Sequence, residues 1–272
     1  MHQVIFAAAT SNVDIVDLKE KNWPDLQVST NVHVDLIEFV IIFFKVGRPF
    51  HIDTGDILHV YNRGVDKRVV FDFDNDRERF IHLLWYVNNY SYPYSKYLRQ
   101  HMLSMSNPEE FITSMYQYEV PLCTIVGYVL MDNHYHLLLR EDGSGGVSKF
   151  LQKLQNAYTR YYNLKNDRTG CLFQGKYKAV LVESHEQLIH VSRYIHLNPV
   201  VAGLIDIGSI SNYKWSSYPT YISRKKNNSV CSPDIVLDNF RSKETFISFT
   251  CASFTSEDDT DSMRNLSIDG GL

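Results

Sequence analysis

The alternation of apolar and polar positions is clearest between residues 57 and 221. Residues 57–62 form a short β-type run that ends at a turn. Over 75–89 the apolar residues recur at intervals of three and four, which predicts a helix with one buried face. Residues 122–131 are almost continuously apolar, as central strands are, and residues 135–140 predict a second strand after a turn.

The pattern continues after a glycine-rich loop. It predicts a helix over 148–163, which its first residue, a serine, can cap, and a strand over 177–182. A last helix is predicted over 184–198, with Ser184 as its N-cap and Pro199 as its stop. The order β-α-β-β-α-β-α, with an antiparallel pair in the middle, predicts an α+β fold. We expect a ferredoxin-like antiparallel sheet with helices on one face.

The chain divides into three predicted parts. Residues 1–50 are an N-terminal extension of unknown role, 51–222 form the domain with the clear elements, and 223–272 are a C-terminal extension. That extension ends in an acidic stretch whose composition predicts disorder. Residues 90–119 are a tyrosine-rich insertion of uncertain structure. The longest apolar run, 39–44, is far shorter than the roughly 20 residues that a membrane span needs, so we expect no membrane association.

Charge is distributed unevenly along the 272 residues. The formal net charge of −4 argues against a nucleic-acid binder. Residues 140–226, however, hold 13 Lys and Arg against 6 Asp and Glu, a net charge of +7. The four cysteines are far apart and form no CxxC pair, which excludes a zinc knuckle and a disulfide scaffold. A reduced, cytoplasmic protein with one basic block fits these features.

His134 and His136 are the first candidate site residues. Side chains alternate between the faces of a strand, so both imidazoles point the same way and Tyr135 points the other way. Two imidazoles on one face can share a divalent metal ion. The motif is weak evidence alone, because two histidines on an edge strand can equally have a structural role.

Tyr194 and Asn198 are the second pair of candidates. A spacing of four residues places them on one helical face, about 6 Å apart along the axis. The amide oxygen of Asn198 is a hard ligand that suits Mg²⁺ or Mn²⁺. Two histidines and one amide oxygen leave coordination positions for a phosphate oxygen and water. Tyr194 can also be an ordinary aromatic of an amphipathic helix, since the chain has 18 tyrosines.

Several ordered motifs resemble a known family. Residues 131–139 are similar to the metal-binding strand of the HUH-type, single-tyrosine transposases (IS200-like), and 62–64 lie where the first strand of that family ends. Residues 170–178 resemble the strand after the central helix, and 193–200 resemble the catalytic helix. The Trp-Ser-Ser-Tyr motif at 215–218 follows, as in the family. The REP-associated tyrosine transposases are the branch with the greatest similarity.

The resemblance implies a role for each candidate. His134 and His136 would be the metal ligands, Asn198 the third ligand, and Tyr194 the nucleophile. The enzyme would use Mg²⁺ or Mn²⁺ to cleave and rejoin single-stranded DNA that bears hairpins, such as repetitive palindromic elements. The intermediate would be a 5′-phosphotyrosine, so no ATP is needed. The resemblance allows a monomer or a homodimer.

DNA contacts are expected from cations of the basic block and from one residue before it. Taken singly, each cation is better explained as part of a solvated face, but the block as a whole favours phosphate binding. The residues expected to bind DNA are Arg63, Lys149, Lys153, Arg160, Lys176, Lys178 and Arg193.

Two other functions stay open. One is a non-mobile regulator that binds hairpin DNA with a vestigial or decaying site, although no ligand or nucleophile is missing. The other is a different HUH nuclease, a relaxase or a replication initiator. Cys171 stands where the family often has His, and Val201 where it often has Arg.

Overall fold

The structure, a computed structural model, describes residues 51–89, 120–223 and 230–252. The expectations for the N-terminal extension, for the insertion at 90–119 and for the acidic tail lie outside the described residues. None of the described helices has the length and apolar composition that crossing a membrane requires. The four cysteines all lie within the described ranges and are free thiols.

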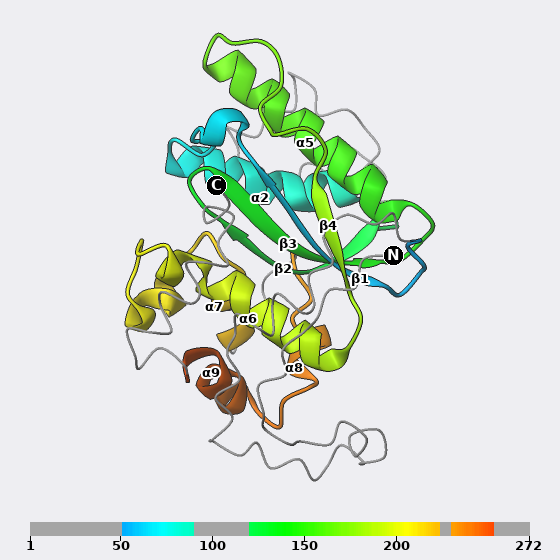
Figure 1. Cartoon of the computed structure of the whole chain (residues 1–272), viewed down its shortest axis with the longest axis vertical. Coiled ribbons are helices and arrows are strands. Elements are labelled where there is room, and N and C mark those ends of the chain that lie inside the picture. The colour runs from blue at the N-terminus through cyan, green and yellow to red at the C-terminus, as the bar shows by residue number, and fades with distance from the viewer. Residues whose placement is uncertain (1–50, 90–119, 224–229, 253–272) are drawn as a thin grey trace, which may run out of the picture. The chain divides into compact units, whose positions relative to one another are not determined.

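A four-stranded antiparallel sheet is the centre of the fold (Figure 1). Its strands lie in the order β2 (Cys123–Leu130), β3 (His134–Glu141), β1 (Ile57–Arg63) and β4 (Lys178–Val182). Helices α2 (Asp74–Asn89) and α5 (Gly146–Lys165) form the two crossovers, which connect β1 to β2 and β3 to β4. This strand order and connectivity confirm the predicted α+β, ferredoxin-like class.

Helices cover both faces of this sheet (Figure 1). Helices α2 and α5 lie together on one face, over a core that includes Leu58, Leu137 and Leu139. The prediction placed helices on this face alone, but α6 (His185–Val201) packs on the opposite face. The reason is that β3 is buried on both sides, and Val126, Val129 and Leu138 give the second face of the sheet an apolar surface that α6 covers.

The segments after α6 complete the second layer. These are η4 (Ile207–Asn212), α7 (Tyr218–Ile222), α8 (Asp234–Leu237) and α9 (Lys243–Cys251). Phe246 of α9 is fully buried and stacks on Tyr221 of α7, with ring centroids 5.3 Å apart. The described part of the predicted C-terminal extension therefore belongs to the hydrophobic core beneath α6.

Two helix boundaries differ from the prediction. Helix α5 begins at Gly146 and ends at Lys165, and Ser148 does not cap it; the buried Glu141 carboxylate accepts the first amides instead. Helix α6 continues through Pro199 to Val201. A proline lacks a backbone N–H, so this close to the end of a helix it removes only one backbone hydrogen bond. The carbonyls that follow can still accept bonds from later amides, and the helix continues. Ser184 is confirmed as the N-cap of α6, since its hydroxyl accepts the amide of Gln187.

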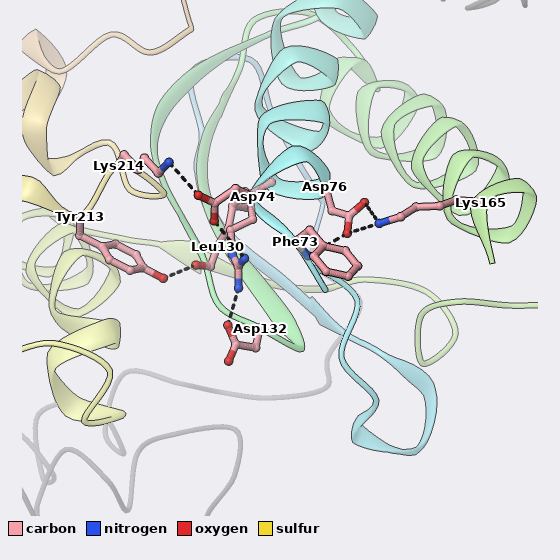
Figure 2. A network of polar contacts seen from close by, with 9 residues as sticks. Phe73, Asp74, Asp76, Leu130, Asp132, Lys165, Tyr213 and Lys214 are labelled. Carbon is pink, nitrogen blue, oxygen red and sulfur yellow. Dashed lines mark hydrogen bonds and ion pairs between the residues drawn. The ribbon is translucent and has the colours of Figure 1, made fainter.

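Ion pairs fix the N-terminus of α2 against its neighbours (Figure 2). The buried Asp76 carboxylate accepts two bonds of 2.6 and 2.7 Å from the ammonium group of Lys165 on α5. Arg77 binds Asp132 in the turn before β3, and Lys214 binds Asp74 at 2.9 Å. The turn that precedes His134 is thus held by a helix on the far face of the sheet.

Candidate active site

His134 and His136 lie on the face of β3 that α6 covers. Their imidazole centroids are 5.2 Å apart, and both side chains are buried. Tyr135 belongs to the core on the other face. The alternation expected from the sequence is therefore present, and it turns both imidazoles toward α6.

Tyr194 and Asn198 of α6 meet these histidines. The ring of Tyr194 lies edge-on to that of His136, with centroids 5.5 Å apart. The side chain of Asn198 hydrogen-bonds to those of His134 and Tyr194, and its Nδ2 donates to the Tyr194 carbonyl at 3.0 Å. The structure thus brings all four candidates together, although β3 and α6 are separated by more than forty residues in the sequence.

His59 is a member of this cluster that the sequence analysis missed. Its Nε2 lies 2.9 Å from Nδ1 of His136, and its ring lies 5.8 Å from that of Tyr194. Strand alternation puts His59 on the same face as Tyr61 and Arg63. A third histidine in the strand that precedes α2 was the available signal, but its meaning depends on the pairing of β1 with β3.

Burial and a nearby positive charge keep these imidazoles neutral. Desolvation is the main cause, and it lowers the pKa of His59 to about 3 and that of His134 to about 4. The pKa of His136 is well below its usual value because of burial, the neighbouring imidazoles and Arg63. Neutral rings at pH 7 carry the lone pair that a metal ligand needs.

The histidine atoms suit a divalent cation. Nε2 of His136 is buried and has no hydrogen-bond partner, while the other nitrogen of the ring faces His59. Within the described ranges, no group of three or more His, Cys, Asp or Glu side chains is placed to hold a metal. A cation at the two strand histidines would therefore depend on the Asn198 oxygen, water and substrate for its other ligands.

A buried hydrogen-bond cluster fixes α6 against the sheet. Nε2 of His196 lies 2.9 Å from Oγ of Ser217, which also accepts the amide of Tyr128 at 2.9 Å. Gly127 beside them leaves no spare room, because an added Cβ would lie 3.3 Å from the same Oγ. The 215–218 motif thus ties the helix that carries Tyr194 to the edge of β2.

The predicted DNA-binding residues fall into separate groups. Arg63 is buried next to the histidines and pairs with His134 in the register of β1 and β3. Lys178 is exposed on β4, and its ammonium lies 5.9 Å from the ring of Tyr61, near the site. Lys176 is exposed two residues earlier. A third group lies on α5, across the sheet from Tyr194; its members are Lys149, Lys153 and Arg160.

Arg193 has a structural role. Its side chain is buried, its Nε donates to the carbonyl of Thr250 at 3.2 Å, and its guanidinium lies over Phe249 at 5.4 Å. It therefore holds α9 against α6 and points away from Tyr194. Its position next to Tyr194 in the sequence was misleading, because adjacent residues of a helix lie about 100° apart around the axis.

Comparison with known protein families points the same way. Residues 81–198 match the family described as "Transposase IS200 like", and this segment contains His134, His136, Tyr194 and Asn198. This match confirms the resemblance drawn from the motifs. A sequence search of curated proteins finds no match. A solved structure of a REP-associated tyrosine transposase bound to a REP hairpin has a TM-score of 0.44 and 15% identity, and the alignment covers 66% of this chain and 87% of that chain.

Proposed function

We propose, from the premise that residues 81–198 belong to the IS200-like transposase family, that this chain cleaves and rejoins single-stranded DNA with Tyr194 as its nucleophile. One observation carries the proposal. The tyrosine and asparagine of α6 meet the two strand histidines in a buried cluster, with the Tyr194 and His136 rings 5.5 Å apart. A nucleophile fixed beside metal-ligand side chains is the arrangement that transfer of a phosphodiester needs.

The proposed reaction exchanges one phosphodiester for another. The Tyr194 oxygen attacks a DNA phosphorus and the bond from phosphorus to the 3′ oxygen breaks. The fragment on the 5′ side of the cut leaves with a 3′-hydroxyl, and the fragment on the 3′ side stays on the enzyme through its 5′ phosphate, as a 5′-phosphotyrosine. The proton that the phenol loses is balanced by the proton that the leaving 3′ oxygen gains. A 3′-hydroxyl of the same or another strand can then reverse the attack. No ATP is consumed, because the covalent bond conserves the energy of the original linkage.

The donors for a divalent cation would be His134, His136 and Asn198. Mg²⁺ or Mn²⁺ bound there would polarise a phosphoryl oxygen and offset the charge that develops on it. Nε2 of His136, which is buried without a partner, supports this assignment.

Tyr194 needs help to become a nucleophile. Burial raises its pKa to about 12, so the phenol is protonated at neutral pH. The hydrogen bond from Asn198 acts in the opposite direction and favours the phenolate. Asn198 therefore has two proposed tasks on one face of α6: it supplies a ligand oxygen, and it orients the nucleophile.

The proposed substrate is single-stranded DNA with hairpins. Arg63, Lys176 and Lys178 lie on the side of the sheet that carries the nucleophile or at its edge, so we assign the strand to be cleaved to them. The cations of α5 lie on the other side of the sheet. We assign a more distant part of the same DNA, such as a hairpin stem, to that surface. Phosphate contacts of this kind carry no sequence information by themselves.

The test is covalent capture. Purified full chain is incubated with Mn²⁺ and a hairpin-bearing single strand labelled on the 3′ side of the expected cut, and the adduct is resolved on a denaturing gel. We expect an adduct with wild type and none with Tyr194→Phe, which keeps DNA binding. Tyr161→Phe is the matched control, since that hydroxyl lies on α5 and bonds to Asp76.

Two results would contradict the proposal in different ways. An adduct with Tyr194→Phe shows that another residue is the nucleophile. Wild type that binds the hairpin and never forms an adduct shows a hairpin-binding regulator with a vestigial site.

A further inference from the structure

Each strand histidine uses its Nδ1 atom for a hydrogen bond within the protein. Nδ1 of His134 lies 2.6 Å from Oδ1 of Asn133, and Nδ1 of His136 lies 2.9 Å from Nε2 of His59. A neutral imidazole carries one ring proton, so the partner of Nδ1 decides which nitrogen keeps a lone pair. The identity of these two partners therefore controls which atoms can bind a cation.

The Asn133 amide has a defined orientation. Its Nδ2 donates to the carbonyl of Lys67 at 3.2 Å, so Oδ1 is the atom that faces His134. An amide oxygen can only accept, which places the ring proton of His134 on Nδ1.

Backbone geometry holds the Lys67 carbonyl in place. Asp66 and Lys67 adopt left-handed conformations, with φ of 55° and 57°, in the short helix η3 (Val65–Lys67). The amide of Gly64 donates to the carbonyl of Asn133 at 2.8 Å, so two bonds connect this turn to the one before β3. Consecutive left-handed residues other than glycine are costly, and the turn that contains them presents the acceptor for the Asn133 amide.

The second ring follows the same logic by a different route. Nε2 of His136 is buried and has no hydrogen-bond partner, so it is the ring nitrogen that is open to a cation, and a cation there leaves Nδ1 to carry the ring proton. A proton on Nδ1 donates to Nε2 of His59 at 2.9 Å.

We propose that Asn133 and His59 are positioning residues: each holds the ring proton of one strand histidine on Nδ1, which leaves both Nε2 lone pairs for a divalent cation. The inference rests on the proposed function, because that function supplies the cation. It assigns new tasks to two side chains outside the ligand set, and it explains why His59 lies in the site. Partners of this kind fix the orientation of ligand rings and raise their basicity.

The first test reads the tautomers directly. Full chain with ¹⁵N-labelled histidine is studied at saturating Mg²⁺ by long-range ¹H–¹⁵N correlation, which distinguishes protonated from unprotonated ring nitrogens. We expect both strand histidines to carry the proton on Nδ1, with signals assigned by loss in the His134→Gln and His136→Gln variants. A proton on Nε2 of either ring overturns the proposal for that ring.

The second test measures Mn²⁺ affinity by calorimetry. Asn133→Ala removes the acceptor and should weaken binding by about 10- to 100-fold. Asn133→Asp keeps an oxygen acceptor and should recover most of that loss. Asn163→Ala is the matched control, because Asn163 also donates to a backbone carbonyl and accepts from a side chain, but on α5.

His59 is tested in the same way. His59→Gln keeps an acceptor near the position of Nε2 and should retain Mn²⁺ affinity, whereas His59→Leu should lose it. Equal affinities for these two variants, with melting temperatures unchanged, overturn the role of His59.

The results separate this inference from the proposed function. One outcome is that the wild type carries its ring protons on Nδ1 and forms no adduct, while Asn133→Ala loses Mn²⁺ binding. That outcome supports the inference and contradicts the proposed reaction. An adduct in wild type together with unchanged Mn²⁺ binding in Asn133→Ala does the reverse. Wild type without measurable Mn²⁺ affinity overturns the cation assignment in both.

Discussion

Ser217→Ala tests how strongly α6, the helix of Tyr194 and Asn198, is tied to the sheet. The Ser217 hydroxyl accepts the Tyr128 amide at 2.9 Å, lies 2.9 Å from Nε2 of His196 and 3.2 Å from the Tyr128 carbonyl. All three residues are buried, so water cannot replace the lost partner at low cost. Alanine keeps the backbone bond from Ser217 to the Tyr128 carbonyl and removes only the contacts made through Oγ.

The size of the effect follows from the groups left without partners. The Tyr128 amide and the His196 ring nitrogen each become buried and unsatisfied, at a cost of about 1–3 kcal/mol apiece. The total loss in the free energy of unfolding is then about 2–6 kcal/mol. For a folded unit of this size, the melting temperature should fall by at least about 4 °C.

Urea unfolding and thermal melts of the full chain measure this loss. Ser232→Ala is the matched control at the same edge of β2, because Ser232 is exposed and bonds to Ile125 through its backbone amide. A double-mutant cycle with His196→Leu should give a coupling of at least about 1 kcal/mol, since the two side chains share one hydrogen bond. A loss below about 1 kcal/mol in Ser217→Ala, or a coupling near zero, refutes the role given to this cluster.

Two further predictions concern pH and salt. Burial lowers the pKa of His196 to about 3, so the folded state loses stability as pH falls from about 6.5 toward 3, and at pH 5 this one group costs about 2 kcal/mol relative to pH 7. His196→Gln cannot gain a proton and should lose about 2 kcal/mol less than wild type between pH 7 and pH 5 in urea unfolding; parallel losses would contradict this. Lys178→Ala should reduce the slope of log K against log salt for single-stranded DNA by about 0.7, whereas Lys214→Ala, whose lysine is paired with Asp74, should leave it unchanged in fluorescence titrations. Equal slopes for both lysine variants would remove Lys178 from the DNA surface.

Much of the candidate site could be predicted from local periodicity in the sequence. A spacing of two on a strand determines that His134 and His136 share a face, and a spacing of four on a helix does the same for Tyr194 and Asn198. Neither rule depends on tertiary structure, so each pair could be predicted by itself. That the two pairs lie next to each other depends on the register of the sheet and on the packing of α6 against it. The sequence implied this proximity only through the family resemblance.

The features that were missed are those decided by tertiary contacts. His59 is an ordinary strand histidine until β1 pairs with β3 and its ring reaches His136. Glu141 caps α5 from the preceding strand, where a side-chain cap at Ser148 was the expected local solution. Arg193 adjoins Tyr194 in the sequence, but the turn of the helix directs it to α9. In each case the local pattern allowed the observed role and could not select it.

The 215–218 motif shows how a distant segment can serve the site without touching substrate. Trp215 lies under the cations of Arg77 and Lys214, the first of which also binds the turn before β3. Two residues later, Ser217 binds β2 and α6. One short segment thus contacts two supports of the site. One is Arg77, which binds the turn before the two histidines, and the other is the helix that carries Tyr194. In the proposed reaction Tyr194 must reach a phosphorus held beside the histidines, so the relative position of these two supports should control the rate. Ser217→Ala should then slow adduct formation even where the fold survives.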